Sequence, residues 1–132
     1  MSLIRDPREV VKAIDFTGVQ NGNIHPTDID CVLEFDNDIL ILIETKKEGN
    51  KIPTGQRLLL ERLIDSWHTE HGIAIKVEYT DEYIGATTIP LHRCVVSKYY
   101  VHGEWHEPKV TKGFVQFINL IGERWGNEKC RF

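Results

Sequence analysis

The chain has 132 residues, about the length of one domain, and we expect a single domain over 1–132. Hydrophobic residues make up 41% and charged residues 27%, which is ordinary for a globular domain and argues against a disordered or fibrous chain. Lys and Arg number 16 against 20 Asp and Glu, so the net charge is −4. This balance argues against a protein that coats nucleic acid through a basic surface, but it leaves room for a local basic groove.

No segment of the sequence predicts a membrane span or a secretion signal. The longest unbroken aliphatic run, Ile39 to Ile43, is far shorter than the roughly 20 residues that a span needs. The N-terminus lacks the apolar stretch of a signal peptide. Cys31, Cys94 and Cys130 are an odd number of widely spaced cysteines, which argues against a disulfide scaffold. We therefore expect a protein of the reducing cytoplasm that has no membrane partner.

The first part of the chain predicts a helix, a loop and a β-hairpin. An Asp-Pro pair favours a helix start, so a short helix is expected over about 7–14. Residues 18–27 are rich in Gly and Asn and indicate a loop. The β-rich runs 29–35 and 39–46 flank a three-residue polar turn, which predicts a hairpin. The second run is apolar at both parities, as expected for a strand covered on both faces.

The rest of the chain predicts further strands between two amphipathic helices. A helix is expected over about 55–70, with Gln56 on its apolar face. The other expected elements are strands over 73–80, 87–89, 94–101 and 105–110 and a closing helix over 111–125. This order predicts a mixed α/β domain that is built around a central β-sheet.

Acidic and basic residues are expected to meet at the end of the hairpin. The turn centres on Asn37, which places Asp30 opposite Glu44 and Asp28 opposite Lys46. Side chains alternate along a strand, so Glu44 and Lys46 share a face. Cross-strand partners have Cβ atoms about 4.5–5.5 Å apart. Two carboxylates and an ammonium are thus expected together at the buried end of a strand, where carboxylates alone would repel each other.

This grouping of charges suits phosphodiester hydrolysis. Carboxylate oxygens are ligands for Mg²⁺ or Mn²⁺, which retain several waters and accept a substrate phosphate. Such a metal polarises the phosphate and lowers the pKa of a bound water. We expect Lys46 to orient the nucleophile or to neutralise the charge that develops on the phosphate.

The segment from His25 to Trp67 resembles the PD-(D/E)xK nuclease superfamily, which has an acid at the head of one strand and Glu-x-Lys on the next. Gln56 looks like the glutamine of the RecB-like and phage exonuclease branches, and Glu9 looks like an N-terminal glutamate of the Holliday-junction-resolvase-like branch. The resemblance implies a restriction-endonuclease-like α/β/α sandwich, with a mixed sheet of four to five strands, and Mg²⁺-dependent cleavage of DNA. The implied catalytic residues are Asp30, Glu44, Lys46 and Gln56, and the implied metal ligands are Asp30, Glu44 and Glu9.

Several alternatives remain open at this point. Asp28 competes with Asp30 as the main metal ligand, and we prefer Asp30 because it directly precedes the hydrophobic strand and lies opposite Glu44. Asp28 could instead pair with Lys46, or support the metal ligands without contacting the metal. The expected nucleic-acid contacts are Lys47, Lys51 and Arg57. The sequence does not distinguish DNA from RNA, or endonuclease from exonuclease. The acidic net charge favours the alternative of a catalytically weak or inactive nuclease-fold protein that serves in nucleic-acid binding or assembly.

The origin and the assembly of the protein are further expectations. The compact size and the pattern Pro-Thr-Asp-Ile-Asp at 26–30 suggest a phage or prophage protein, which would act in the host cytoplasm. A homo-oligomer or a protein partner could supply further contacts to DNA.

Overall fold

The computed structural model describes residues 14–132 except 84, 86 and 87. The expected helix over about 7–14 therefore lies almost wholly outside the described residues. Glu9, the expected N-terminal metal ligand, lies outside them too. Residues 18–27 contain no helix, and their backbone pairing is confined to a bridge between Asn21 and Ile24, as the loop prediction requires. None of the described helices is long and apolar enough to cross a membrane.

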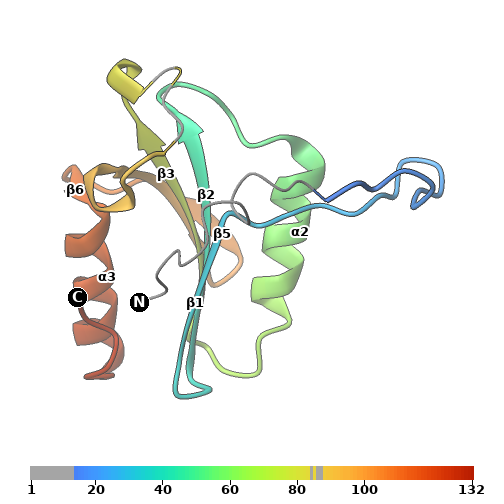
Figure 1. Cartoon of the computed structure of the whole chain (residues 1–132). Helices are drawn as coiled ribbons and strands as arrows, with labels where there is room; N and C mark the ends of the chain where they lie inside the picture. The colour runs from blue at the N-terminus through green and yellow to red at the C-terminus, as the bar shows by residue number, and fades with distance from the viewer. Residues whose placement is uncertain (1–13, 84, 86–87) are drawn as a thin grey trace.

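A mixed β-sheet runs through the centre of the described chain (Figure 1). Its strands are β1 (Cys31–Phe35), β2 (Ile39–Lys47), β3 (Gly72–Tyr79), β4 (Val95–Val101), β5 (Glu104–His106) and β6 (Lys112–Gly113). The order is β1-β2-β3-β4-β5, and β6 pairs with β4. β2 and β3 run parallel, whereas the other pairs are antiparallel. The predicted mixed α/β class is confirmed, with the short β6 added to a main path of five strands.

Two helices cover opposite faces of this sheet, α2 (Thr54–Asp65) and α3 (Phe114–Trp125) (Figure 1). Side chains alternate along β2, so its apolar residues supply two cores. Ile39, Ile41 and Ile43 pack in the cluster that includes α3, whereas Leu42 packs with Leu60 of α2. The run of aliphatic residues at both parities therefore reflects a strand that is covered on both faces, as predicted.

The β1–β2 hairpin forms in the predicted register. Cys31 pairs with Ile43, and Phe35 pairs with Ile39. Asp36 and Asn37 of the turn have φ values of 55° and 56°. Asp and Asn tolerate this left-handed conformation better than most residues, because their short polar side chains can bond to the local backbone.

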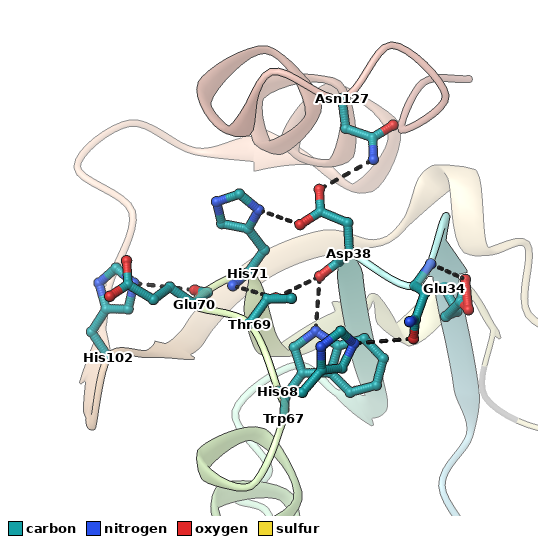
Figure 2. A network of polar contacts seen from close by, with 10 residues as sticks. Glu34, Asp38, Trp67, His68, Thr69, Glu70, His71, His102 and Asn127 are labelled. Atoms are coloured by element: carbon teal, nitrogen blue, oxygen red, sulfur yellow. Dashed lines mark hydrogen bonds and ion pairs between the residues drawn. The ribbon is translucent and has the colours of Figure 1, made fainter.

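The helix predicted over 55–70 ends earlier, at Asp65. Trp67 Nε1 and Thr69 Oγ1 donate hydrogen bonds to the backbone carbonyl of Asp38, at 2.8 and 2.6 Å (Figure 2). The Asp38 carboxylate accepts further hydrogen bonds from His71 Nδ1 at 2.8 Å and Asn127 Nδ2 at 3.3 Å (Figure 2). Tertiary contacts to the β1–β2 turn thus replace the last helical turns that local propensity favours.

Other boundaries also differ from the prediction, and β1 begins at Cys31 rather than at residue 29. The strand expected over 105–110 is shorter, because β5 ends at His106. Thr88 and Ile89 of the strand expected over 87–89 belong to no strand, and Thr87 is outside the described residues. The last helix starts at Phe114 rather than residue 111, because Lys112 and Gly113 pair with β4. The ends of β5 and the start of the last helix depend on which residues pair with β4.

Candidate active site

Asp30 and Glu44 lie side by side where the β1–β2 ladder ends. Asp30 precedes Cys31, which pairs with Ile43, so Glu44 is the next residue opposite. The backbone N–H of Asp30 donates to Glu44 Oε1 at 3.2 Å. In return, the backbone N–H of Thr45 donates to Asp30 Oδ2 at 2.7 Å. These reciprocal hydrogen bonds confirm the predicted juxtaposition and hold the two carboxylates in place.

The two carboxylates differ in their exposure to solvent. Glu44 is only 1% exposed, whereas Asp30 is exposed, so the expectation that both lie at a buried end holds for Glu44 alone. Burial raises the pKa of Glu44 to about 7, and the negative charge of Asp30 adds to this effect. The hydrogen bond from the Asp30 backbone and the charge of Lys46 act in the opposite direction. A cation beside both carboxylates would favour the ionised form of Glu44 and offset the cost of its burial.

Lys46 lies two residues after Glu44 in β2, so both side chains are on the same face of the strand, and Lys46 is partly buried. Its charge is near enough to lower the pKa of Glu44. The suggested pairing of Lys46 with Asp28 does not form, since Asp28 is exposed and no ion pair joins these two described residues. Lys46 therefore keeps an ammonium available beside the carboxylates.

Gln56 lies in the first turn of α2 and reaches back to the segment that carries the acids. Its Nε2 donates to the backbone carbonyl of Asp28 at 3.4 Å. The partly buried side chain thus connects α2 to the chain just before Asp30, but it hydrogen-bonds to neither carboxylate. The structure places Gln56 at the border of the site, where it can steady the approach to Asp30.

Two further charged residues belong to this cluster and were missed in the sequence. Lys76 and Glu78 of β3 lie directly beside Glu44 and Lys46, respectively, in the parallel β2–β3 pairing. Lys76 and Glu44 are the only buried charged side chains of the described residues. Lys76 Nζ forms an ion pair with Glu78 Oε2 at 3.1 Å, and the same oxygen accepts from the backbone N–H of Gly49 at 3.0 Å. The signal available in the sequence is the pair of charged residues at alternate positions of an apolar run.

The three expected nucleic-acid contacts lie on β2, on the loop that follows it and on α2. Lys47 is the last residue of β2, and Lys51 is exposed in the loop that leads to α2. Arg57 forms an ion pair with Glu61, which also accepts a hydrogen bond from Trp105 Nε1. Arg57 is therefore held on the side of α2 that faces β5.

The donor set fits a hard divalent cation with an incomplete shell of protein ligands. No group of three or more His, Cys, Asp or Glu in the described part of the chain is arranged to hold a metal. Mg²⁺ is commonly bound by one or two carboxylates and completes its shell with water and substrate phosphate. Asp30 and Glu44, with one carboxylate exposed and one buried, suit that mode of binding.

No protein-family model, curated protein or solved structure matches the chain. The assignment of a function therefore depends on the geometry and chemistry of the Asp30–Glu44 cluster and on the motif that this cluster carries.

Proposed function

We propose that this protein is a metal-dependent nuclease that hydrolyses phosphodiester bonds of DNA. The observation that carries the proposal is the reciprocal hydrogen bonding of Asp30 and Glu44, with Lys46 on the same face of the strand. A buried carboxylate with a raised pKa in a cluster of charged groups is a feature of functional sites. The resemblance to the PD-(D/E)xK superfamily supports the same activity and a restriction-endonuclease-like arrangement of the sheet and helices.

Asp30 and Glu44 would hold Mg²⁺ or Mn²⁺, and the bound ion would polarise the scissile phosphate and lower the pKa of a water. The backbone N–H of Thr45 fixes the Asp30 carboxylate, so that its other oxygen is left for a ligand. Lys46 stabilises the negative charge that grows on the phosphate oxygens, because its partly buried side chain brings a positive charge to the face of β2 that carries Glu44. Gln56 steadies the backbone before Asp30 through its bond to the Asp28 carbonyl.

The first experiment measures metal binding by titration calorimetry with Mn²⁺. Wild-type protein should bind the ion, whereas Asp30→Asn and Glu44→Gln should lose most of the affinity. Glu34→Gln is the matched control, since it removes an exposed carboxylate of β1 away from the cluster. Equal binding by Asp30→Asn and wild type would remove Asp30 from the site and favour Asp28 in its place.

The second experiment measures cleavage of linear, single-stranded, nicked and branched DNA and of a matched RNA. Cleavage should require Mg²⁺ or Mn²⁺ and fail with Ca²⁺, which occupies oxygen sites with looser geometry. The two ligand variants should be inactive, and Glu34→Gln should cut like wild type. Metal binding without cleavage of any DNA would favour the alternative of a catalytically inactive protein for nucleic-acid binding or assembly.

A further inference from the structure

The charged cluster continues beyond the two carboxylates as a row across the sheet. Glu44 of β2 pairs with Lys76 of β3, and Lys76 pairs with Lys98 of β4. Asp30 lies on the other side of Glu44, so the row reads Asp30, Glu44, Lys76, Lys98. Acidic residues occupy the end at β1, and basic residues occupy the end at β4.

Glu44, Lys76 and Lys98 lie on the face of the sheet that α2 covers. On β2, β3 and β4, each member is two residues away from a residue of the core cluster under α2, and side chains two apart share a face. The three core residues in question are Leu42, Ala74 and Tyr100. A bulge in β4 changes the register only beyond Lys98, between the partners of Lys76 and Val77, so Lys98 keeps this orientation.

The two lysines of the row differ in their burial and in their ion pairs. Lys76 is buried and paired with Glu78. Lys98 is exposed, and it makes no ion pair or hydrogen bond with another described side chain. Lys98 is thus the member of the basic end that a ligand can reach, and its partner in the β3–β4 pairing is a second lysine.

The charge of the whole cluster sets which ligand it attracts. Three carboxylates (Asp30, Glu44, Glu78) and three lysines (Lys46, Lys76, Lys98) cancel when all are ionised. A divalent cation held by Asp30 and Glu44 leaves an excess of positive charge, and the lysines place part of that excess toward β4. A polyanion that meets the metal with one phosphate is therefore drawn across β3 toward Lys98.

We propose that Lys98, supported by the charge of Lys76, forms a subsite for a phosphate next to the scissile one, so that the substrate strand crosses the sheet from β1 toward β4. This inference rests on the proposed nuclease function. Lys98 lies two strand spacings, about 10 Å, from Glu44. A nucleic-acid strand carries at least one more phosphate within that distance, since a duplex strand has one charge per about 3.4 Å of its axis.

The test compares Lys98→Ala with Lys109→Ala and with the charge-retaining Lys98→Arg. Lys109 is an exposed lysine that lines a groove with Phe117 and Arg124 of α3, on the opposite face of the sheet. Binding of a fluorescent single-stranded oligonucleotide is followed by anisotropy in Ca²⁺ over a range of salt concentrations. Lys98→Ala should weaken binding about three- to tenfold and reduce the salt slope by about 0.7, the value for one phosphate contact. Lys98→Arg should restore both, and Lys109→Ala should change neither.

Cleavage rates on two substrates then show which phosphate is involved. The loss in Lys98→Ala should be at least tenfold larger on the oligonucleotide than on bis(p-nitrophenyl) phosphate, which has a single phosphate. Equal losses on both would overturn the neighbouring-phosphate subsite, and so would equal salt slopes for Lys98→Ala and Lys109→Ala. If wild type cuts neither substrate, the nuclease function fails, but the salt slopes still support or overturn the phosphate subsite.

Discussion

Glu44 is the residue at which burial and charge conflict most directly. Its carboxylate is almost fully buried and lies beside a second carboxylate, while the nearby Lys46 offsets only part of the cost. A residue selected for stability alone would be neutral at this position, because a buried charge without a close partner is costly. The conflict is resolved if a cation binds, which is why Glu44 is the centre of the proposed site.

The pH dependence of stability should report the state of Glu44 in metal-free protein. Its pKa is raised from 4.5 to about 7 in the folded state, so the folded protein binds more protons than the unfolded chain between these values. The free energy of unfolding should therefore fall as pH rises from about 4.5 through 7, by up to about 3 kcal/mol. Urea denaturation in EDTA at pH 5 and 8 measures this change. Glu44→Gln should flatten the profile, and a slope equal to that of wild type would contradict the assignment.

Lys46 should be needed for catalysis but not for metal binding. Removal of one preorganised electrostatic contact typically lowers a rate by about 10²–10³. Lys46→Ala should show such a loss in DNA cleavage, while Mn²⁺ titration still detects the ion, because the lysine is not a ligand. Lys109→Ala is the control for the loss of one positive charge. Cleavage by Lys46→Ala at the wild-type rate would make Lys46 a structural partner of the carboxylates.

At the scale of elements, α3 is packed on one side by the sheet and on another by the chain that follows it. The helix ends at Trp125, and the next residue, Gly126, has a φ of 66°, a left-handed conformation that glycine adopts without strain. The chain then turns back, and the Cys130 thiol approaches the carbonyl of Ile118 at 3.5 Å. This return requires a residue without a side chain at Gly122, where a Cβ would lie 2.1 Å from the Cys130 carbonyl oxygen.

Gly122→Ala should therefore destabilise the protein, although alanine is the better helix former. The propensity gain is at most about 1 kcal/mol. Overpacking against a backbone carbonyl typically costs about 1–3 kcal/mol and cannot be relieved by a side-chain rotation. Thermal denaturation should show a lower Tm for Gly122→Ala. The matched control is Gly113→Ala, since a Cβ there meets nothing within 4 Å, and an equal loss in both variants would rule out the close approach as the cause.

At the scale of the whole molecule, one end of the sheet carries the charged cluster and the other end carries a network of hydrogen bonds. Several charged side chains lie together near Glu44 at one end of β2, and their ion pairs and hydrogen bonds compensate only part of their charge. At the other end, Asp38 connects the hairpin to two distant segments, because it accepts hydrogen bonds from Trp67, Thr69, His71 and Asn127 (Figure 2). His71 also stacks on Trp125 of α3, with ring centroids 4.7 Å apart. The far end thus fixes the two helices relative to the hairpin on which the site is built.

Asp38→Ala should lower global stability more than the loss of a surface ion pair does. The variant leaves His71 and Asn127 without their acceptor, and a charge-assisted hydrogen bond contributes about 1.5–3 kcal/mol. Lys129→Ala is the control, since it breaks the exposed pair with Asp36 and should leave the free energy of unfolding nearly unchanged. Urea denaturation of both variants tests the difference. Similar midpoints would show that the Asp38 network does not connect the segments energetically.

The sequence by itself determined the local part of the site. Two β-rich runs and the turn of Asp and Asn between them set the hairpin register, and this register brings Asp30 to Glu44. Both features depend on neighbouring residues only, so they could be predicted without a structure. The aliphatic run in β2 likewise indicated cover on both faces.

Only the tertiary structure decided the parts that depend on distant pairing. The parallel pairing of β2 with β3 and the bulged pairing with β4 place Lys76, Glu78 and Lys98 beside the carboxylates. A crossover through a helix leaves that register free of any local turn geometry, so no short-range pattern specifies it. Contacts between segments distant in sequence also decide that α2 ends early and that Glu44 is buried while Asp30 is exposed. Hydrogen bonds and solvent exclusion across the fold outweigh the small free-energy differences that local propensity supplies.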